Sequence, residues 1–206
     1  AINQGELVLH YQPQVDQSGV VVGAEALIRW NCPESGLIPP AKFIHVAESS
    51  RLIIDIGDWV VNKACAQLAE WRRIPGLGQM GVAVNISAKH FVEVDFIKKI
   101  KSALEAHSLD PRLLKLEITE SMLMADARSV IAKMSFLREM GVKISIDDFG
   151  TGYSSLAYLT LLPADQLKID RSFVRKIGQS HADSVVVKTV IGMAQSLGMD
   201  VIAEGV

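Results

Sequence analysis

Six short segments of the sequence each carry an acid, an amide or a lysine at or near the C-terminal end. These residues are Glu25, Asn85, Glu117, the pair Asp147 and Asp148, Lys168 and Glu204. Each segment is rich in valine, isoleucine or leucine, which is typical of a β-strand. Strand ends that are far apart in sequence can meet where the strands lie parallel, as at the catalytic rim of a β/α barrel. The pattern predicts one site built from several strands.

Five acids and one lysine would meet in this site. Two carboxylates about 4 Å apart repel by about 4 kcal/mol at an effective dielectric of about 20. Such a cluster either stays partly protonated or binds cations. The donors are carboxylate and amide oxygens, which favours two Mg²⁺ or Mn²⁺ ions over zinc. Asp147 and Asp148 are adjacent and suited to bridging two metal ions. Two metal ions held close together can activate a water for in-line attack on a phosphate.

The elements that would position these residues alternate between strand and helix. The first two strands, 6–12 and 20–29, are too close in sequence for a crossover helix, so they are predicted to form an antiparallel hairpin. Helices are then predicted at 40–50, 58–71, 95–107, 126–140, 153–161 and 183–197, and strands at 82–86, 113–118, 142–148, 166–170 and 200–204. Three aspartates are predicted helix N-caps, namely Asp95, Asp126 and Asp183. Gly141 is predicted to end a helix in the left-handed conformation. Alternation of this kind is typical of an α/β fold.

Residue parity within the strands favours a barrel over an open sheet. Val82, Val84 and Ile86 share one face, while Ala83 and Asn85 share the other. The strands at 113–118 and 142–148 show the same division. An open doubly wound sheet needs two apolar faces, whereas the inner face of a barrel can be partly polar. We therefore expect the polar strand ends to face the mouth of a barrel.

The composition predicts one globular domain over residues 1–206, with 49% hydrophobic and 21% charged residues. The net charge of −2 gives no reason to expect a nucleic-acid duplex or an anionic membrane as a partner. Two isolated cysteines, Cys32 and Cys65, favour a reducing compartment over a disulfide framework. No apolar run approaches the roughly 20 residues that cross a bilayer. The chain is expected to be cytoplasmic, although its parent protein could be anchored to a membrane.

Two other enzyme classes are weaker alternatives. Residues 148–150 read DFG as in protein kinases, but the chain has neither the glycine-rich loop nor an HRD segment. A metal-dependent barrel enzyme that stabilises an enolate has no matching set of motifs here. The histidines do not have the spacing of metal ligands, and they are predicted to be structural or surface residues. They are His10, His45, His90, His107 and His181.

The residues singled out above belong to motifs that closely resemble the EAL-domain family of cyclic di-GMP phosphodiesterases. The motifs are YQP at 11–13, EALIRW at 25–30, VNIS at 84–87, EITES at 117–121, DDFGTGYSSL at 147–156, LKID at 167–170 and AEGV at 203–206. They extend over nearly the whole chain. The resemblance implies a modified TIM-type (β/α) barrel with an antiparallel first strand. It also implies hydrolysis of one phosphodiester bond of cyclic di-GMP to linear pGpG, in bacterial second-messenger signalling.

The resemblance also implies a role for each matching residue. The implied metal ligands are Glu25, Asn85, Glu117, Asp147 and Asp148. The implied catalytic residues are Glu25, Asp148, Lys168 and Glu204, with Lys168 contacting the nucleophilic water or the scissile phosphate. The implied substrate contacts are Gln12, Leu27 and Arg29. The implied regulatory loop contains Phe149, Gly150, Thr151 and Gly152, and Glu120 steadies it. In this family the loop couples dimer contacts to metal binding, so a homodimer is implied.

An active phosphodiesterase and a catalytically inactive cyclic di-GMP receptor or signalling module are both compatible with the resemblance. Every acid of the motifs is intact, which favours the enzyme. Family members continue past AEGV through another helix and a final strand bearing Gln-Gly-Tyr. This chain is therefore expected to be truncated before the final strand, and to be unstable, inactive or dependent on a partner chain when alone. Further signalling domains are expected in the parent protein.

Overall fold

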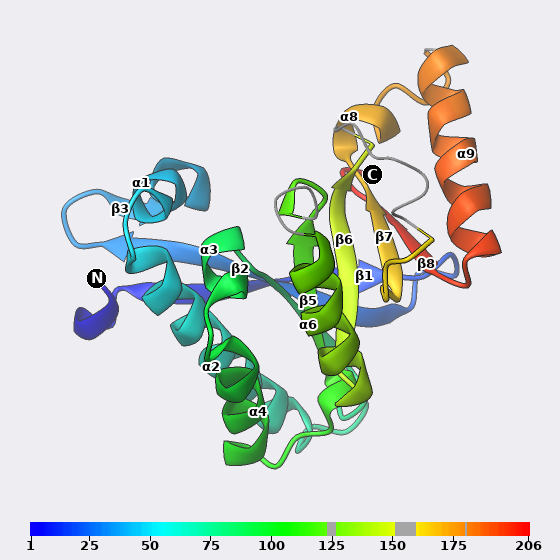
Figure 1. Ribbon diagram of the computed structural model, residues 1–206. Helices are drawn as coiled ribbons and strands as arrows, with labels where there is room; N and C mark the ends of the chain where they lie inside the picture. The colour runs from blue at the N-terminus through cyan, green and yellow to red at the C-terminus, as the bar shows by residue number, and fades with distance from the viewer. Residues whose placement is uncertain (123–126, 151–159, 180) are drawn as a thin grey trace. The chain divides into compact units, whose positions relative to one another are not determined.

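The computed structural model describes residues 1–122, 127–150, 160–179 and 181–206. The chain divides into two compact units, Ala1–Leu116 and Glu117–Val206 (Figure 1). After the opening strands, helical segments and strands follow one another along the described chain, as the sequence predicts. None of the described helices is both long and apolar enough to cross a lipid bilayer.

The sheet of the first unit is centred on a long hairpin. Strands β1 (Leu7–Val15) and β2 (Val21–Cys32) pair antiparallel, which confirms the hairpin predicted from the short connection. Asp16 stabilises the turn, because its Oδ1 accepts from the backbone N–H groups of Ser18 at 2.8 Å and Val20 at 3.0 Å. Strand β4 (Gly81–Asn85) joins β2 in parallel, and the short β3 (Gly36–Ile38) pairs antiparallel with β2.

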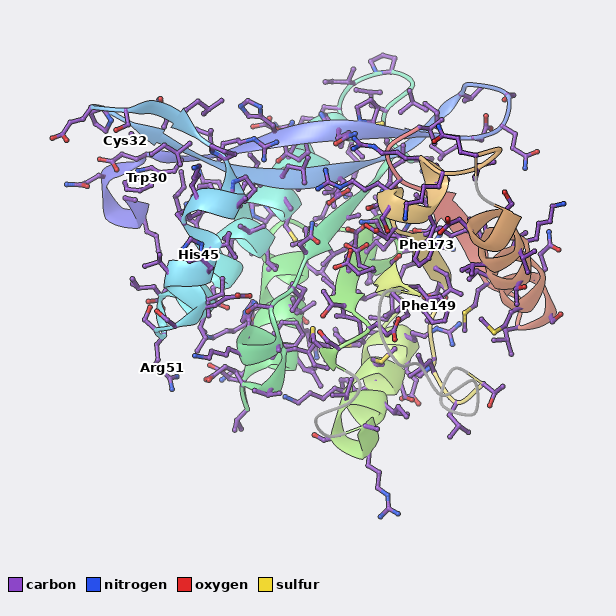
Figure 2. The ribbon with its side chains drawn as sticks, turned by 90° about the horizontal axis from the view of Figure 1, so that it is seen from above. Trp30, Cys32, His45, Arg51, Phe149 and Phe173 are labelled. Atoms are coloured by element: carbon purple, nitrogen blue, oxygen red, sulfur yellow. The ribbon has the colours of Figure 1, made fainter. Side chains whose placement is uncertain are left out.

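Near β3, aromatic and polar contacts hold the far end of β2. The indole N–H of Trp30 donates to Glu6 Oε2 at 2.9 Å, and its ring meets Phe43 edge-on. Cys32 lies two residues further along the strand (Figure 2). Cys32 and Cys65 are both free thiols.

Helices of the first unit pack around α2 (Leu52–Trp71), which buries an apolar face containing Ile53, Val60, Val61 and Leu68. Its neighbours are α1 (Ile44–Glu48), α3 (Ala88–Val92) and α4 (Phe96–Ala106). Three single turns of 3-10 helix complete the unit, at η1 (Ile2–Gln4), η2 (Pro40–Lys42) and η3 (Pro111–Leu113). Helix α2 begins at Leu52 rather than at the predicted residue 58, and Gly57 lies inside it.

The second unit contains a parallel sheet of β6 (Lys143–Phe149), β7 (Gln166–Ile169) and β8 (Asp200–Ala203). Strand β5 (Leu114–Thr119) spans the boundary, so its last three residues open this unit. Helix α6 (Ala127–Glu139) packs on β6, and α9 (His181–Ser196) packs on β7 and β8 (Figure 1). A short helix, α8 (Arg171–Val174), follows β7 directly and contacts α9.

The predicted parity of the strands is confirmed. Ile144 and Ile146 of β6 are 0% exposed, as are Leu114, Leu116 and Ile118 of β5. Gly141 has the predicted left-handed backbone, with φ of 96°. The strand and helix order and the antiparallel first strand agree with the predicted fold class.

The predicted caps were partly wrong. Asp95 stands at the N-cap position of α4, but its side chain makes no capping hydrogen bond and instead pairs with Lys99. Asp183 lies inside the first turn of α9, which begins at His181. Asp126 and most of the predicted helix at 153–161 fall outside the described residues. The short elements β3, α3 and α8 were missed because three to five residues are too few to show a periodic pattern.

Candidate active site

Lys168 is a buried lysine, and three carboxylates of the second unit lie around its ammonium group. Its side chain is 1% exposed, and its Nζ lies 2.7 Å from Glu117 Oε2, 3.1 Å from Asp147 Oδ2 and 2.7 Å from Glu204 Oε1. Lys168 belongs to β7, and the acids come from β5, from β6 and from the residue that follows β8. The backbone N–H of Glu204 donates to Ile169 O at 3.1 Å, which extends the β7 and β8 pairing by one residue. The structure thus brings four predicted site residues together.

The ion pairs of this cluster offset a large cost of burial. Moving one ion into a protein interior costs several kcal/mol, and the cost is recovered only through short contacts and satisfied hydrogen bonds. The ammonium of Lys168 has three N–H donors, and three acid oxygens lie within 3.1 Å of it. With all groups ionised, three acids and one lysine leave the cluster with an excess of negative charge. The cluster is therefore both held in place and attractive to further cations.

Asp147 and Asp148 are tied to each other at the end of β6. The backbone N–H of Asp148 donates to Asp147 Oδ1 at 2.8 Å, while Asp147 Oδ2 faces Lys168. Asp148 has a φ of 55°, in the left-handed region that non-glycine residues seldom occupy. Burial raises the pKa of Asp148, and the nearby carboxylates of Asp147 and Asp170 raise it further. Strained backbone and a shifted carboxyl pKa in one place are typical of functional sites.

Glu120 links the end of β5 to the end of β6. Its side chain is 4% exposed, its Oε2 accepts from the backbone N–H of Gly150 at 3.0 Å, and its own N–H donates to Asp147 O at 3.1 Å. Gly150 has a φ of 95°, and a Cβ there would come within 3.3 Å of the ring of Phe173. Glu120 therefore holds the start of the predicted regulatory loop. Phe149 is 5% exposed, and Thr151 and Gly152 fall outside the described residues.

The first unit brings a second pair of predicted residues together. Glu25 lies on β2, Asn85 is the last residue of the neighbouring parallel strand β4, and Asn85 Nδ2 donates to Glu25 Oε1 at 2.7 Å. The register pairs Glu25 with Ala83, so Asn85 projects from the same face two residues further along. This contact is consistent with the expectation that these two strand-end residues lie at one site.

The predicted substrate residues follow Glu25 along the hairpin. Leu27 and Arg29 have the same parity as Glu25 on β2, so the three residues share one face. Both are half-buried, and Arg29 Nη1 donates to the carbonyl of Ile28 at 2.8 Å. Gln12 is exposed on β1 and stands opposite Glu25 in the antiparallel register.

The oxygen atoms of the predicted metal ligands are of the kind that hard divalent cations prefer. Within the described ranges, no group of three His, Cys, Asp or Glu side chains is arranged so that it could hold a metal ion. In the second unit, the acids face the ammonium of Lys168 instead. The predicted ligands offer only carboxylate and amide oxygens, which are the donors of Mg²⁺ and Mn²⁺ sites. The metal ligand set stays a prediction.

Sequence reasoning missed one polar network in the first unit. His90 was predicted to be structural or superficial; it is buried, 1% exposed, and its Nε2 lies 2.9 Å from Asp58 Oδ1. No spacing in the sequence connects these two residues, because they meet only when α2 and α3 pack.

The chain belongs to the EAL domain family, because the family model described as EAL domain matches residues 1–206. A Pseudomonas aeruginosa protein named bifunctional diguanylate cyclase/cyclic di-GMP phosphodiesterase MucR is 44% identical over 207 residues, which cover 100% of this chain and 30% of MucR. The cyclic di-GMP phosphodiesterase NbdA of the same organism is 43% identical over 207 residues, covering 100% of this chain and 26% of NbdA. The chain therefore spans less than a third of the length of these relatives.

Solved structures share the fold of the whole chain. The structure described as PaMucR phosphodiesterase in complex with c-di-GMP superposes with a TM-score of 0.95 at 44% identity, and the match covers 100% of this chain and 83% of that one. The cGMP-bound form of the EAL enzyme Bd1971 gives a TM-score of 0.92 at 38% identity, covering 100% of this chain and 57% of that one. The predicted fold, a modified TIM-type barrel with an antiparallel first strand, is thus confirmed at the level of the family.

Proposed function

We propose that this chain is a phosphodiesterase that hydrolyses one phosphodiester bond of cyclic di-GMP and releases linear pGpG. Two relatives that match the whole chain at 44% and 43% identity carry the name of this activity, MucR and NbdA. The structural neighbour with a TM-score of 0.95 is described as a complex with c-di-GMP. The observation that carries the proposal is the buried Lys168 with its three short ion pairs, because a charge cluster of this kind serves chemistry better than stability.

Two Mg²⁺ or Mn²⁺ ions fit the donor chemistry of the motifs. The residues that would hold them are Glu25, Asn85, Glu117, Asp147 and Asp148. Bound there, the ions would supply a water of low pKa and neutralise charge on the phosphate. The pair formed by Asn85 and Glu25 would present its carboxylate in a fixed orientation, because the amide N–H already holds one oxygen.

Lys168 and Glu204 would act on the reacting groups. All three acids around Lys168 lie within hydrogen-bond distance, so an N–H becomes available for a phosphate oxygen or a water only when one acid is bound elsewhere. Glu204 is half-buried, whereas Glu117 is buried, which makes Glu204 the acid best placed to exchange its partner. A lysine that turns toward substrate as the acids are neutralised would couple ion binding to catalysis.

Substrate binding would use the face of β2 that carries Glu25. Arg29 has a planar guanidinium that matches phosphate geometry, and its contact with the Ile28 carbonyl is one that a phosphate could replace. Leu27, between them on the same face, offers an apolar surface to a ribose or a base. Gln12 on β1 stands opposite Glu25 and offers an amide to the substrate.

Regulation and assembly are also proposals. Glu120 fixes the backbone of Gly150 and so orders the start of the loop that follows Asp148. A contact between two copies of the chain near this loop would alter the backbone that carries Asp147 and Asp148, which is how a homodimer would control activity. Because the relatives are more than three times as long as this chain, the parent protein is proposed to carry further signalling domains. A cytoplasmic location remains a prediction.

The activity is tested by incubating the 206-residue chain with cyclic di-GMP and Mg²⁺ or Mn²⁺ and separating the products. Release of pGpG that stops on chelation supports the proposal. Calorimetric binding of cyclic di-GMP without turnover, in this chain and in one extended beyond Val206, would assign the receptor role instead. Turnover only in the extended chain would support the proposed activity and show that it requires residues after Val206.

A further inference from the structure

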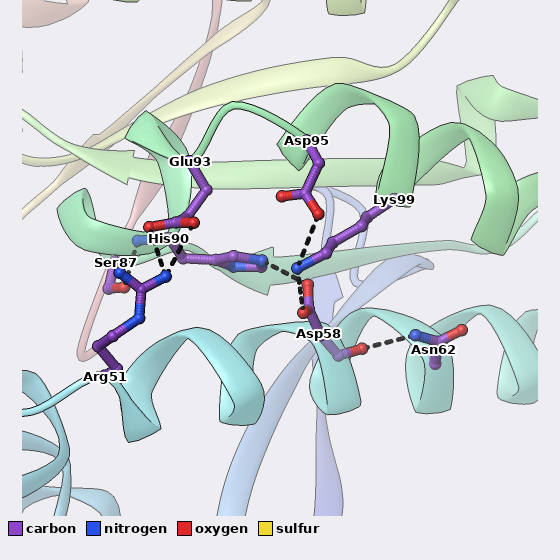
Figure 3. Close-up of polar contacts among 8 residues, drawn as sticks. All are labelled: Arg51, Asp58, Asn62, Ser87, His90, Glu93, Asp95 and Lys99. Carbon is purple, nitrogen blue, oxygen red and sulfur yellow. Dashed lines mark hydrogen bonds and ion pairs between the residues drawn. The ribbon is translucent and has the colours of Figure 1, made fainter.

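A polar network joins three helices of the first unit. Asp58 of α2 contacts two partners, with its Oδ1 2.9 Å from His90 Nε2 and its Oδ2 2.7 Å from Lys99 Nζ. Lys99, on α4, also lies 3.4 Å from Asp95 Oδ2 (Figure 3). Asp58 thereby fixes α2 to both α3 and α4 through side chains that point toward one another.

The ring of His90 also packs against Gly57 and Phe96. It packs over the Cα of Gly57, where any Cβ would overlap Nδ1, and Phe96 meets it edge-on with centroids 4.8 Å apart. Among the described residues, Nδ1 has no hydrogen-bond partner. Because Asp58 accepts a hydrogen bond, the ring proton belongs on Nε2, and Nδ1 is left as an unprotonated nitrogen. His90 is thus held as one neutral tautomer.

The backbone of His90 is part of the turn that follows Asn85. Ser87 is the N-cap of α3, and its Oγ accepts from the N–H of His90 at 3.2 Å. Ser87 lies two residues after Asn85, whose amide donates to Glu25. The path from α2 to the Glu25 carboxylate therefore runs through His90, the Ser87 cap and Asn85, with a hydrogen bond or a short stretch of backbone at each step.

We propose that His90 is a positioning residue for Asn85. Its hydrogen bond to Asp58 anchors the turn between β4 and α3 to helix α2, and loss of that bond, by substitution or by protonation of the ring, displaces the Asn85 amide from Glu25. A catalytic role for Asn85 rests on the proposed function. The positioning of the Asn85 amide by His90 does not depend on that function.

Lowering the pH is expected to disturb the contact between His90 and Asp58 by adding a second proton to the ring. The groups that face the ring are Asp58 from α2, Lys99 from α4 and Asp95 at the start of α4. Burial lowers the pKa of His90, the hydrogen bond to Asp58 opposes that change, and the nearby Lys99 adds to it. A second proton would enter at Nδ1, against Gly57, where the described residues offer no acceptor. The charged ring must therefore move, and the turn must move with it.

The test is nuclear magnetic resonance of the ¹⁵N-labelled 206-residue chain between pH 8 and pH 5. The ring nitrogens of His90 are expected to show the Nε2-protonated tautomer at pH 8. The side-chain amide of Asn85 is expected to shift with the same midpoint as His90. In His90→Gln, whose amide can still donate to Asp58 but cannot titrate, that shift should disappear. His107→Gln, at the end of α4, is the matched control and should leave the shift in place.

Substitution supplies a readout that does not depend on turnover. At pH 7.5, His90→Leu is expected to weaken Mn²⁺ binding by about tenfold, the low end of losses seen when a residue supporting a metal ligand is removed. His90→Gln is expected to restore most of that affinity. If His90→Leu does not fold, the pH titration of the wild-type chain and of His90→Gln still decides.

The two proposals can fail separately. An Asn85 amide that ignores the His90 titration, or that is equally placed in His90→Leu and the wild-type chain, overturns the positioning role even if the chain hydrolyses cyclic di-GMP. Absence of hydrolysis or of Mn²⁺ binding, with an Asn85 amide that still follows His90, overturns the proposed function and leaves the positioning role intact.

Discussion

Lys168 and Glu117 form an ion pair of 2.7 Å in which neither side chain reaches solvent, with exposures of 1% and 0%. A pair this deeply buried contributes little to stability compared with apolar side chains of the same volume. Its presence at the ends of β5 and β7 is therefore better explained by what the two charges do for a reaction.

Replacing Lys168 with methionine keeps most of the volume and leaves Glu117 as a buried charge. We expect hydrolysis to be lost and the free energy of unfolding to fall by about 3–5 kcal/mol, the usual cost of removing one partner of a buried pair. Urea unfolding and product release measure the two effects. Lys143→Met, at an exposed position of β6, is the control. A Lys168→Met protein as stable as the wild-type chain would contradict the described ion pairs.

The backbone conformation of Asp148 is predicted to lower the free energy of unfolding, while its carboxylate contributes to hydrolysis. Its φ of 55° strains a residue with a Cβ, so Asp148→Gly should raise the free energy of unfolding by about 1 kcal/mol while reducing hydrolysis. Ser108, with a φ of 50°, is the matched control. Ser108→Gly should be similarly stabilising without changing hydrolysis. Equal activity in both variants would show that the Asp148 carboxylate has no catalytic part.

Gly57 is predicted to be required by the ring above it. Gly57→Ala places a Cβ into His90, and overpacking of this kind costs about 1–3 kcal/mol. Adding His90→Ala should recover part of the loss, because the two sites are in contact and their effects are not additive. Gly192→Ala, in α9 with nothing within 4 Å of its Cβ, should instead stabilise the chain by about 0.5–1 kcal/mol. Additive effects at Gly57 and His90 would argue against the contact.

Stability is predicted to decrease in mild acid through His90. Because burial lowers its pKa in the folded chain, the unfolded chain takes up the proton first as the pH falls through the ordinary value of 6.5. The free energy of unfolding should therefore drop below pH 6.5 and level off once the folded ring is also protonated. His90→Gln should flatten this part of the curve in urea unfolding measured from pH 8 to pH 5. A wild-type curve that does not fall in this range would mean that the folded ring titrates normally.

The order of strands along the chain and the acids at the strand ends could be predicted from the sequence, because each depends on a short local pattern. Parity placed Asn85 on the face shared with Ala83, and the short connection before Val21 gave the antiparallel hairpin. Motifs singled out Lys168, but its burial among three acids follows only from the packing of β5 to β8. Its surroundings were therefore outside the reach of a local pattern.

Long-range packing explains the misplaced start of α2. The predicted start at residue 58 directly follows Gly57, and glycine inside a helix costs about 1 kcal/mol. The structure shows why that cost is accepted: the missing side chain makes room for His90, which is far away in the sequence. Asp95 illustrates the same limit, because it stands where a cap is expected but pairs with Lys99.

The central proposal is that Glu25 and Glu117 are each required for a metal-dependent hydrolysis of cyclic di-GMP. Its most direct test is the Mn²⁺-dependent rate of pGpG formation for Glu25→Gln and for Glu117→Gln, with the exposed Glu34→Gln as control, in the shortest chain that shows wild-type activity. We predict that either substitution alone reduces the rate at least about 100-fold, more than the loss of a supporting residue causes, and that Glu34→Gln does not. A chain that keeps its rate after losing either Glu25 or Glu117 would contradict the account.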